Sequence, residues 1–230
     1  MLRPTAALRL ANITGAANAS FGRLGYLRTH MADVAAEAGI SSGSIYNYVE
    51  SKEALFHLVI ATGFGLLEDL PNLPLPTPRF ESTLCMIDAG LRRNSTTPIL
   101  SAALEIDDPA NPVAELDAVI NELYEMMRSL SRVLPAIEKC AIDLPDLDKM
   151  YFGRGRPQLI NHLSKYVTKR SKSGHFVESP DVAITTQIIL EIVAWFTWKR
   201  FKGHDANRFD DQLSRQTVIE FVRHALIRQR

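Results

Sequence analysis

The chain has no excess of charge of either sign, since its 230 residues contain 26 Lys and Arg against 26 Asp and Glu. An overall positive field, the simplest attraction to nucleic acid, is therefore excluded. The first 57 residues are nearly balanced too, with five basic and four acidic side chains. Any affinity for a polyanion must come from where individual charges sit and from their doubling in a dimer.

Cysteines and metal-binding patterns are equally scarce. Cys85 and Cys140 lie in apolar helical patterns without CxxC spacing, so we expect reduced, buried packing residues of a cytosolic protein. The six histidines show neither HxxxH nor HExxH spacing. The sequence therefore predicts no metal site and no cofactor.

Long hydrophobic runs are missing as well. The most apolar stretch, residues 182–198, contains Thr185, Gln187 and Glu191 and is too short and too polar to span a bilayer. Residues 2–13 are interrupted by charged and polar side chains, unlike a signal peptide. We expect a soluble, cytoplasmic protein without a membrane segment.

The apolar residues recur at helical spacings of three and four, and no convincing alternation indicates a strand, so we predict an all-α fold. Residues 71–78, PNLPLPTP, carry four prolines and exclude a helix. We therefore expect a first domain over residues 1–70, a rigid linker over 71–79 and a second helical domain over 80–230. A seam over 113–137 predicts a long amphipathic helix in a bundle, although Pro135 interrupts it.

The two last helical segments have the composition of an interface. Residues 182–201 are apolar on nearly every side, and the segment 213–226 is amphipathic and could lie beside them. A helix in a small domain buries two faces only if something covers the second. We interpret this pair as the centre of a homodimer interface and expect a charge at Val193 to dissociate the dimer.

Residues 31–55, MADVAAEAGISSGSIYNYVESKEAL, predict a helix-turn-helix. Thr29 is placed to cap a helix that begins near His30, and Gly39 can adopt the left-handed conformation that ends it. Ser41 or Ser42 can cap the next, very short helix, on which Ile45 is the inward anchor. A turn of three or four residues joins the two helices, as in helix-turn-helix DNA readers.

With Ile45 inside, the rest of the second helix faces outward. Asn47 can bond adenine bidentately, and tyrosine hydroxyls can reach phosphates. Free amides at helix starts also favour a phosphate oxygen, and Ser51 is expected to cap the helix that carries Lys52. The candidate DNA-contacting residues are Thr29, His30, Ser42, Gly43, Ser44, Tyr46, Asn47, Tyr48 and Lys52.

The segment 13–55 resembles the DNA-binding domain of the TetR family of bacterial transcriptional regulators. The matching features are Ile13, Ala16-Ala17, Phe21, Gly25-Tyr26, Thr29 and the run DVAAEAGISSGSIYNYVESKEAL. The chain departs from the family pattern at Thr14, Gly15, Ser20, Ser42 and Val49. Because Ser42 stands where a basic residue is common, this domain is less basic than many relatives.

The resemblance implies a dimeric regulator with an effector cavity in the C-terminal domain. The function predicted is a repressor, not an enzyme, that binds a palindromic operator and is released by a small, apolar or aromatic ligand. Met and aromatic residues at helical spacing are more often ordinary core, so the cavity residues are only candidates. They are Met86, Asp88, Leu104, Tyr124, Met127, Tyr151, Phe152 and Trp195.

The alternative is a helical small-molecule-binding protein or enzyme whose helix-turn-helix has lost DNA binding, which the low basicity favours. Residues 39–43 match the G-x-S-x-G nucleophile elbow, but that elbow needs a strand before it. Residues 154–157, RGRP, are interpreted as a loop before a helix that starts at Pro157. The basic run Lys165, Lys169, Arg170 and Lys172 is interpreted as the solvated end of a helix.

Overall fold

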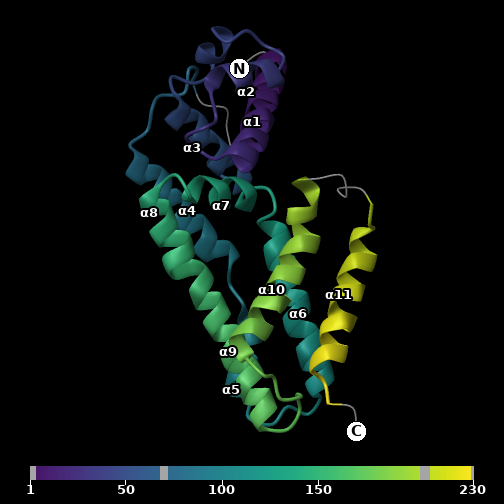
Figure 1. Ribbon diagram of the computed structural model, residues 1–230. Coiled ribbons are helices and arrows are strands. Elements are labelled where there is room, and N and C mark those ends of the chain that lie inside the picture. The colour runs from purple at the N-terminus through teal and green to yellow at the C-terminus, as the bar shows by residue number, and fades with distance from the viewer. Residues whose placement is uncertain (1–3, 68–71, 203–207, 229–230) are drawn as a thin grey trace. The chain divides into compact units, whose positions relative to one another are not determined.

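The computed structural model describes residues 4–67, 72–202 and 208–228, which contain helices and no strand, as predicted (Figure 1). The helices are α1 (Pro4–Leu24), α2 (Met31–Glu37), α3 (Lys52–Gly63), α4 (Phe80–Asn94), α5 (Pro98–Glu105), α6 (Pro112–Ser129), α7 (Leu134–Ala141), α8 (Pro145–Met150), α9 (Arg156–Lys172), α10 (Val182–Thr197) and α11 (Asp211–Leu226). Three short turns of helix join them: η1 (Ser44–Asn47), η2 (Tyr151–Gly155) and η3 (Lys199–Lys202).

Packing divides the chain into two compact units. The first unit comprises residues 1–93 and 132–151, and the second comprises residues 94–131 and 152–230. Helix α4 therefore packs with the first unit although it follows the proline-rich segment. The compact units do not divide at residues 71–79, and the predicted assignment of functions to residues 1–70 and 80–230 stays a prediction.

In the first unit, α1 packs against α2, α3 and α7. An aromatic cluster fills the centre of this packing: the Phe21 ring lies 5.2 Å from Phe56 and 5.9 Å from Tyr26. Burial of these three aromatic side chains stabilises the fold by roughly several kcal/mol. The cluster therefore holds α1 against α3. Cys140 is buried as expected, whereas Cys85 is exposed on α4.

The proline-rich segment is not a free connector. Its described part, residues 72–79, contains no helix, as predicted, and Pro71 lies outside the described residues. The Leu75 amide donates to the Tyr48 carbonyl at 2.8 Å, and the Glu50 amide donates to the Leu75 carbonyl at 3.0 Å. The Thr77 amide also donates to the Glu50 carboxylate at 2.9 Å. These bonds attach the segment to the chain that follows η1.

In the second unit, α10 packs against α6, α9 and α11, and α5 packs against α6 and α9. The predicted long helix over 113–137 is wrong: α6 ends at Ser129, and a separate helix, α7, begins at Leu134 in the first unit. Pro135 stands in the first turn of α7. Proline is favoured at the start of a helix and disrupts its interior, so the seam divides here.

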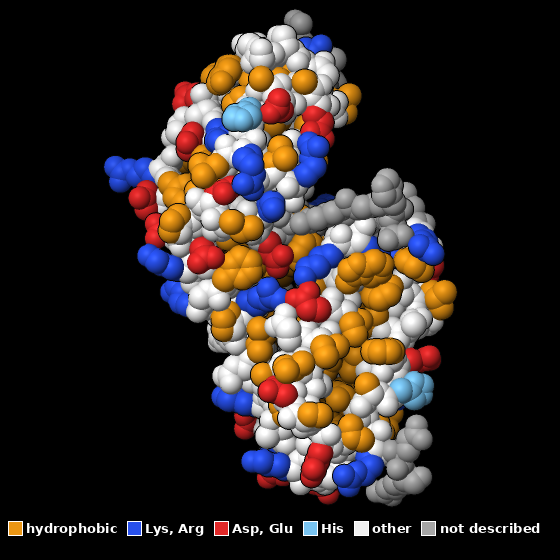
Figure 2. Space-filling model, in the orientation of Figure 1, with side chains coloured by type: hydrophobic (Ala, Val, Ile, Leu, Met, Phe, Trp, Pro, Cys, Tyr) orange, Lys and Arg blue, Asp and Glu red, His pale blue; other side chains and the backbone are white. Residues whose placement is uncertain are grey.

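Helix α10 has two different apolar faces. Ile189 and Val193 are buried within the unit, at 4% and 0% exposure, whereas Ile184 and Ile188 are 61% and 52% exposed. Figure 2 shows hydrophobic side chains gathered on the exposed side of the second unit. The prediction that a charge at Val193 would act on a dimer is corrected here, because Val193 belongs to the core of the subunit.

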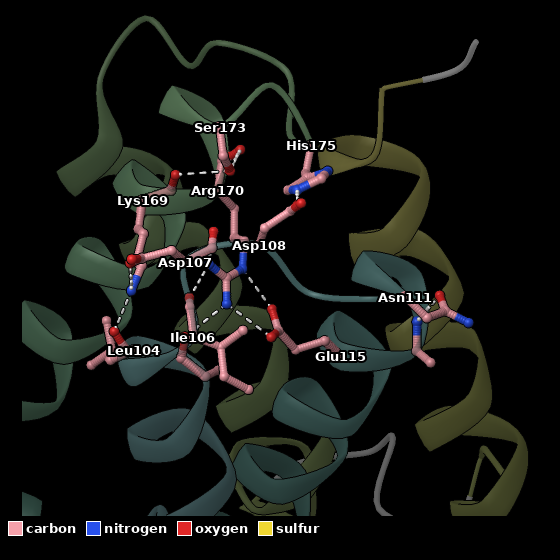
Figure 3. A network of polar contacts seen from close by, with 12 residues as sticks. Leu104, Ile106, Asp107, Asp108, Asn111, Glu115, Lys169, Arg170, Ser173 and His175 are labelled. Atoms are coloured by element: carbon pink, nitrogen blue, oxygen red, sulfur yellow. Dashed lines mark hydrogen bonds and ion pairs between the residues drawn. The ribbon is translucent and has the colours of Figure 1, made fainter.

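Arg170 is the largest departure from the sequence-based interpretation in this unit. Its side chain is fully buried, not solvated, and its guanidinium forms a bidentate pair with Glu115 at 2.6 and 2.8 Å (Figure 3). It also donates to the carbonyls of Ala103 at 2.7 Å and Ile106 at 2.9 Å. The guanidinium thus satisfies carbonyls at the end of α5, where helical acceptors lack partners.

Candidate nucleic-acid interface

The first helix of the predicted reader ends as the sequence indicates. Gly39 has φ +70°, its amide donates to the Ala36 carbonyl at 3.1 Å, and the Ile40 amide donates to the Ala35 carbonyl at 2.9 Å. This pair of bonds is the Schellman arrangement, which favours glycine because only glycine adopts the left-handed conformation without strain. Val34 is fully buried and anchors α2 in the unit.

The second helix of the reader is a single 3-10 turn, η1. Ser41, one of the two predicted caps, accepts the Ser44 amide at 3.2 Å, and the two serine hydroxyls lie 2.6 Å apart. Ile45 is fully buried, as predicted. The Ser44 hydroxyl is thus engaged in holding the turn, while the neighbouring side chains project from it.

The predicted base-reading side chains lie on the surface of this turn. Ser42, Gly43 and Asn47 are exposed, and Tyr46 is 50% exposed. Tyr48 is half-buried, and its carbonyl receives the Leu75 amide. The exposed set can donate and accept hydrogen bonds at base edges in a major groove; that it does so stays a prediction.

Thr29 does not have the predicted role of helix cap. It is only 1% exposed, and its hydroxyl donates to the Gly25 carbonyl at 2.7 Å. The residue before α2 is instead His30, which is exposed and forms no capping bond through its side chain. The Thr29 side chain therefore closes the turn after α1.

Lys52 is likewise engaged within the unit. Its ammonium donates to the carbonyls of Tyr26 at 3.0 Å and Thr29 at 3.3 Å, and it lies 4.7 Å from the centre of the Tyr26 ring. Ser51 caps α3 as predicted, accepting the Ala54 amide at 3.1 Å. Lys52 thus ties the start of α3 to the turn between α1 and α2.

The same turn is held by a residue just after α7 that sequence reasoning missed. The Asp143 carboxylate accepts the Leu27 amide at 3.0 Å. Gly25 has φ +89°, and a Cβ there would approach Asp143 Oδ2 to 2.6 Å. No local signal connects residues 116 positions apart in the sequence, so only the packing of α7 on α1 reveals this contact.

Two ionisable side chains with shifted pKa values, Tyr26 and Glu53, lie beside this turn. Burial raises the pKa of the Tyr26 hydroxyl well above its ordinary value, and the nearby Glu53 carboxylate raises it further. Glu53 has a lowered pKa because its own backbone amide and the Tyr26 hydroxyl favour the carboxylate. The charge of Glu53 therefore persists at neutral pH beside Lys52, so the start of α3 is not a strongly positive surface.

Comparison with known proteins decides what this arrangement resembles. Residues 13–59, from the middle of α1 into α3, match the family described as bacterial regulatory proteins, tetR family. This segment matches the TetR family. The TetR-family segment contains α2, η1 and Lys52. No curated protein matches the chain.

Solved structures are similar to the chain over a longer stretch than this segment. A mutant of HlyIIR gives a TM-score of 0.50 at 19% identity, with 100% of each chain covered. A TetR-family transcriptional regulator structure from Mesorhizobium loti MAFF303099 gives 0.49 at 16%, covering 98% of this chain and 100% of that one. AibR in complex with isovaleryl coenzyme A and operator DNA gives 0.45 at 16%, covering 93% and 97%. At such identities, the HlyIIR likeness shows the fold alone.

The candidate ligand-binding residues do not form one site within either unit. Met86, Asp88 and Tyr151 belong to the first unit, whereas Leu104, Tyr124, Met127, Phe152 and Trp195 belong to the second. Several already have partners inside their own unit. Asp88 pairs with Arg92 at 2.8 Å, and the Tyr151 hydroxyl donates to Glu138 at 3.0 Å.

Within the second unit, the candidates differ in environment. Tyr124 is fully buried, and its hydroxyl donates to the Asp211 carboxylate at 3.3 Å. Trp195 is 36% exposed and contacts the rings of Phe196 and Phe209. Helical spacing alone could not separate a core tyrosine from a surface tryptophan, because it fixes a face of the helix but not what covers that face.

Three features of other protein classes concern the described residues: a hydrolase nucleophile elbow, a metal site and a membrane-spanning helix. Helix α2 precedes Gly39, and η1 follows it, so the residues of the G-x-S-x-G match do not stand after a strand. Within the described ranges, no group of three His, Cys, Asp or Glu side chains could hold a metal ion. None of the helices in those ranges is long and apolar enough to cross a membrane.

Proposed function

We propose that the protein is a transcriptional regulator that binds a palindromic operator as a homodimer, acting as a repressor that a small, apolar or aromatic ligand releases. Each subunit would place Ser42, Gly43, Tyr46 and Asn47 in a major groove. The observation that carries this proposal is the pairing of the Schellman turn at Gly39 with the exposed polar surface of η1. This is the geometry of a helix-turn-helix reader.

The affinity would rest on position more than on charge. Because Lys52 is bonded to two carbonyls of the α1–α2 turn, its main contribution is to hold that turn and the amides at the start of α2. Amides at a helix start can contact phosphates without any cationic side chain. Two helix-turn-helix surfaces of modest affinity, held one helical turn of DNA apart by the dimer, would supply the specificity.

The dimer would form through the exposed apolar face of α10 and α11. Ile184, Ile188, Leu213 and Phe221 are all more than half exposed. Large side chains gathered in this way mark an interaction surface when they form one patch. A twofold axis through such a patch would bury the same residues from both subunits.

Selection of genomic fragments followed by gel-shift titration tests the DNA part of this proposal. Tyr46→Ala and Asn47→Ala should each weaken the selected complex by about 1–3 kcal/mol, because both side chains are exposed and can contact DNA without holding the fold. Asn12→Ala, an exposed asparagine on α1, is the matched control and should leave affinity unchanged. Equal affinity of all three variants would place the reading surface elsewhere.

The same titration addresses the second candidate, a helical small-molecule-binding protein with a vestigial reader. The internal engagement of Lys52 and Thr29 favours that candidate, because it leaves fewer groups for phosphates. Absence of any specific, salt-sensitive complex across the genomic fragments would support it and reject the regulator.

A further inference from the structure

Residues 132–143, which comprise α7 and the residues on either side of it, lie close against α1 and the end of α3 (Figure 1). A Cβ on Gly22 of α1 would lie 3.1 Å from Pro135 Cβ, and a Cβ on Gly63 of α3 would lie 2.8 Å from Val133 Cβ. Side chains at these two glycines would push the segment away from the helices. The segment is thus a closely packed part of the unit that contains the helix-turn-helix, although it follows α6 of the second unit in the sequence.

The end of this segment reaches the α1–α2 turn, residues 25–30. Asp143 Oδ2 accepts the Leu27 amide at 3.0 Å. A Cβ on Gly25 would lie 2.6 Å from that oxygen and 3.2 Å from the Lys139 carbonyl oxygen. The turn therefore needs glycine at this position for two reasons, the positive φ of the backbone and the close approach of the segment.

The α1–α2 turn is where the chain enters the helix-turn-helix, since α2 begins at Met31 directly after it. Buried Val34 and Ile45 attach α2 and η1 to the unit, whereas the turn sets where α2 starts. Two side chains from other parts of the unit hold the turn in complementary ways. The Lys52 ammonium donates to two of its carbonyls, and the Asp143 carboxylate accepts one of its amides.

We propose that Asp143 is a positioning residue for operator binding, which keeps the α1–α2 turn, and through it α2 and η1, in the arrangement that reads DNA. This role rests on the proposed function, because it concerns the affinity for an operator. The carboxylate has the same sign of charge as the phosphates, so it acts through the Leu27 amide and not on DNA. Without this acceptor the turn adopts other arrangements, and the apparent affinity falls with the fraction of molecules that can bind.

Amide hydrogen exchange of the full chain without DNA, followed by NMR, tests the ordering of the turn. Asp143→Ala should speed the exchange of the Leu27 amide severalfold, because that amide loses its acceptor. Asp143→Asn keeps an acceptor oxygen and should exchange nearly as the wild type does. Asp148→Ala removes an exposed carboxylate of α8 and is the matched control, with unchanged exchange at Leu27. Asp143→Leu serves in place of Asp143→Ala if circular dichroism shows that the alanine variant does not fold.

Gel-shift titration with the selected operator then tests the positioning, at a temperature at which every variant is folded. Asp143→Ala should weaken the complex by about fivefold, the effect of one hydrogen bond that water partly reaches. Asp143→Asn and Asp148→Ala should bind nearly as the wild type does. The dependence of affinity on salt should stay that of the wild type in all variants, because no phosphate contact is lost. Equal affinity of Asp143→Ala and the wild type, or an Asp143→Asn variant as weak as Asp143→Ala, would overturn the proposal.

The two measurements separate this role from the proposed function. A wild type that forms no specific operator complex rejects the proposed function, and the exchange measurement still decides whether Asp143 orders the turn. A wild type that binds its operator, together with Leu27 exchange that Asp143→Ala does not change, rejects the role of Asp143 alone. Faster exchange and weaker binding in Asp143→Ala, both restored in Asp143→Asn, support both.

Discussion

Replacement of Arg170 by methionine should strongly destabilise the second unit. The guanidinium is fully buried and makes two bonds to Glu115 and two close bonds to backbone carbonyls. Burial by itself would lower the pKa of Arg170, but Glu115 outweighs that effect and the pKa is raised. Arg170 therefore keeps its positive charge in the folded state.

The magnitude follows from what the substitution leaves behind. The Glu115 side chain is only 12% exposed, and in the Arg170→Met variant its carboxylate loses its counter-ion. Breaking one half of a buried pair costs about 3–5 kcal/mol. Removing both charges with Arg170→Met and Glu115→Leu should restore much of that loss, because no charge then remains buried alone. The carbonyls of α5 stay uncapped, so recovery should be incomplete.

Tryptophan fluorescence during urea unfolding measures this effect in the correct unit. The two tryptophans of the chain, Trp195 and Trp198, both belong to the second unit. The Arg170→Met midpoint should fall by about 1–2 M urea. Lys172→Met, an exposed cation two residues along the same helix, should leave the midpoint unchanged. A loss below about 1 kcal/mol, or a double variant no more stable than the single one, would refute the reasoning.

Three further results are expected. Lys52→Met should lower stability of the first unit by about 1–2 kcal/mol, measured by circular dichroism in urea; an unchanged midpoint would contradict the structural role of its ammonium. Burial lowers the pKa of His57, so its neutral form is favoured in the fold. The stability it contributes is present above the ordinary histidine pKa of about 6.5 and is lost as pH falls through the lower folded value. His57→Gln should therefore flatten the acid side of the stability profile, and an unaltered profile would exclude this group. Ile188→Glu should weaken the proposed dimer by roughly 3 kcal/mol or more while the subunit stays folded, because a twofold axis buries the charge twice. Sedimentation of Ile188→Glu should show a folded monomer. Val193→Glu should instead unfold the second unit. If Ile188→Glu remains a folded dimer, the interface does not include this residue.

Several features followed from the sequence because their causes are local. The end of α2 at Gly39 and the cap at Ser51 each depend on residues within about five positions. The family match over residues 13–59 rests on the same local pattern. Hydrophobic spacing also predicted the apolar character of α10, though not which of its faces the subunit covers.

The proline-rich segment shows the limit of composition as a guide to domains. Its prolines correctly predicted a break in helix, because proline lacks the amide that a helix needs. Composition could not show that Leu75 pairs with the chain after η1, since that bond is made by the backbone and any residue except proline could supply it. Nor could it show that α4 packs with the first unit.

What the sequence determined by itself is the reader: a helix, a left-handed glycine, an anchored turn and a capped helix, all specified by neighbouring residues. What only the tertiary structure decided is how charges and polar groups are used. Arg170 was interpreted as solvated and is buried against Glu115, 55 positions away; Lys52 lies against the α1–α2 turn, 23 and 26 positions away. The sequence shows which side chains are charged, but packing determines which groups they pair with, because an unpaired buried charge costs several kcal/mol, roughly enough to unfold the unit.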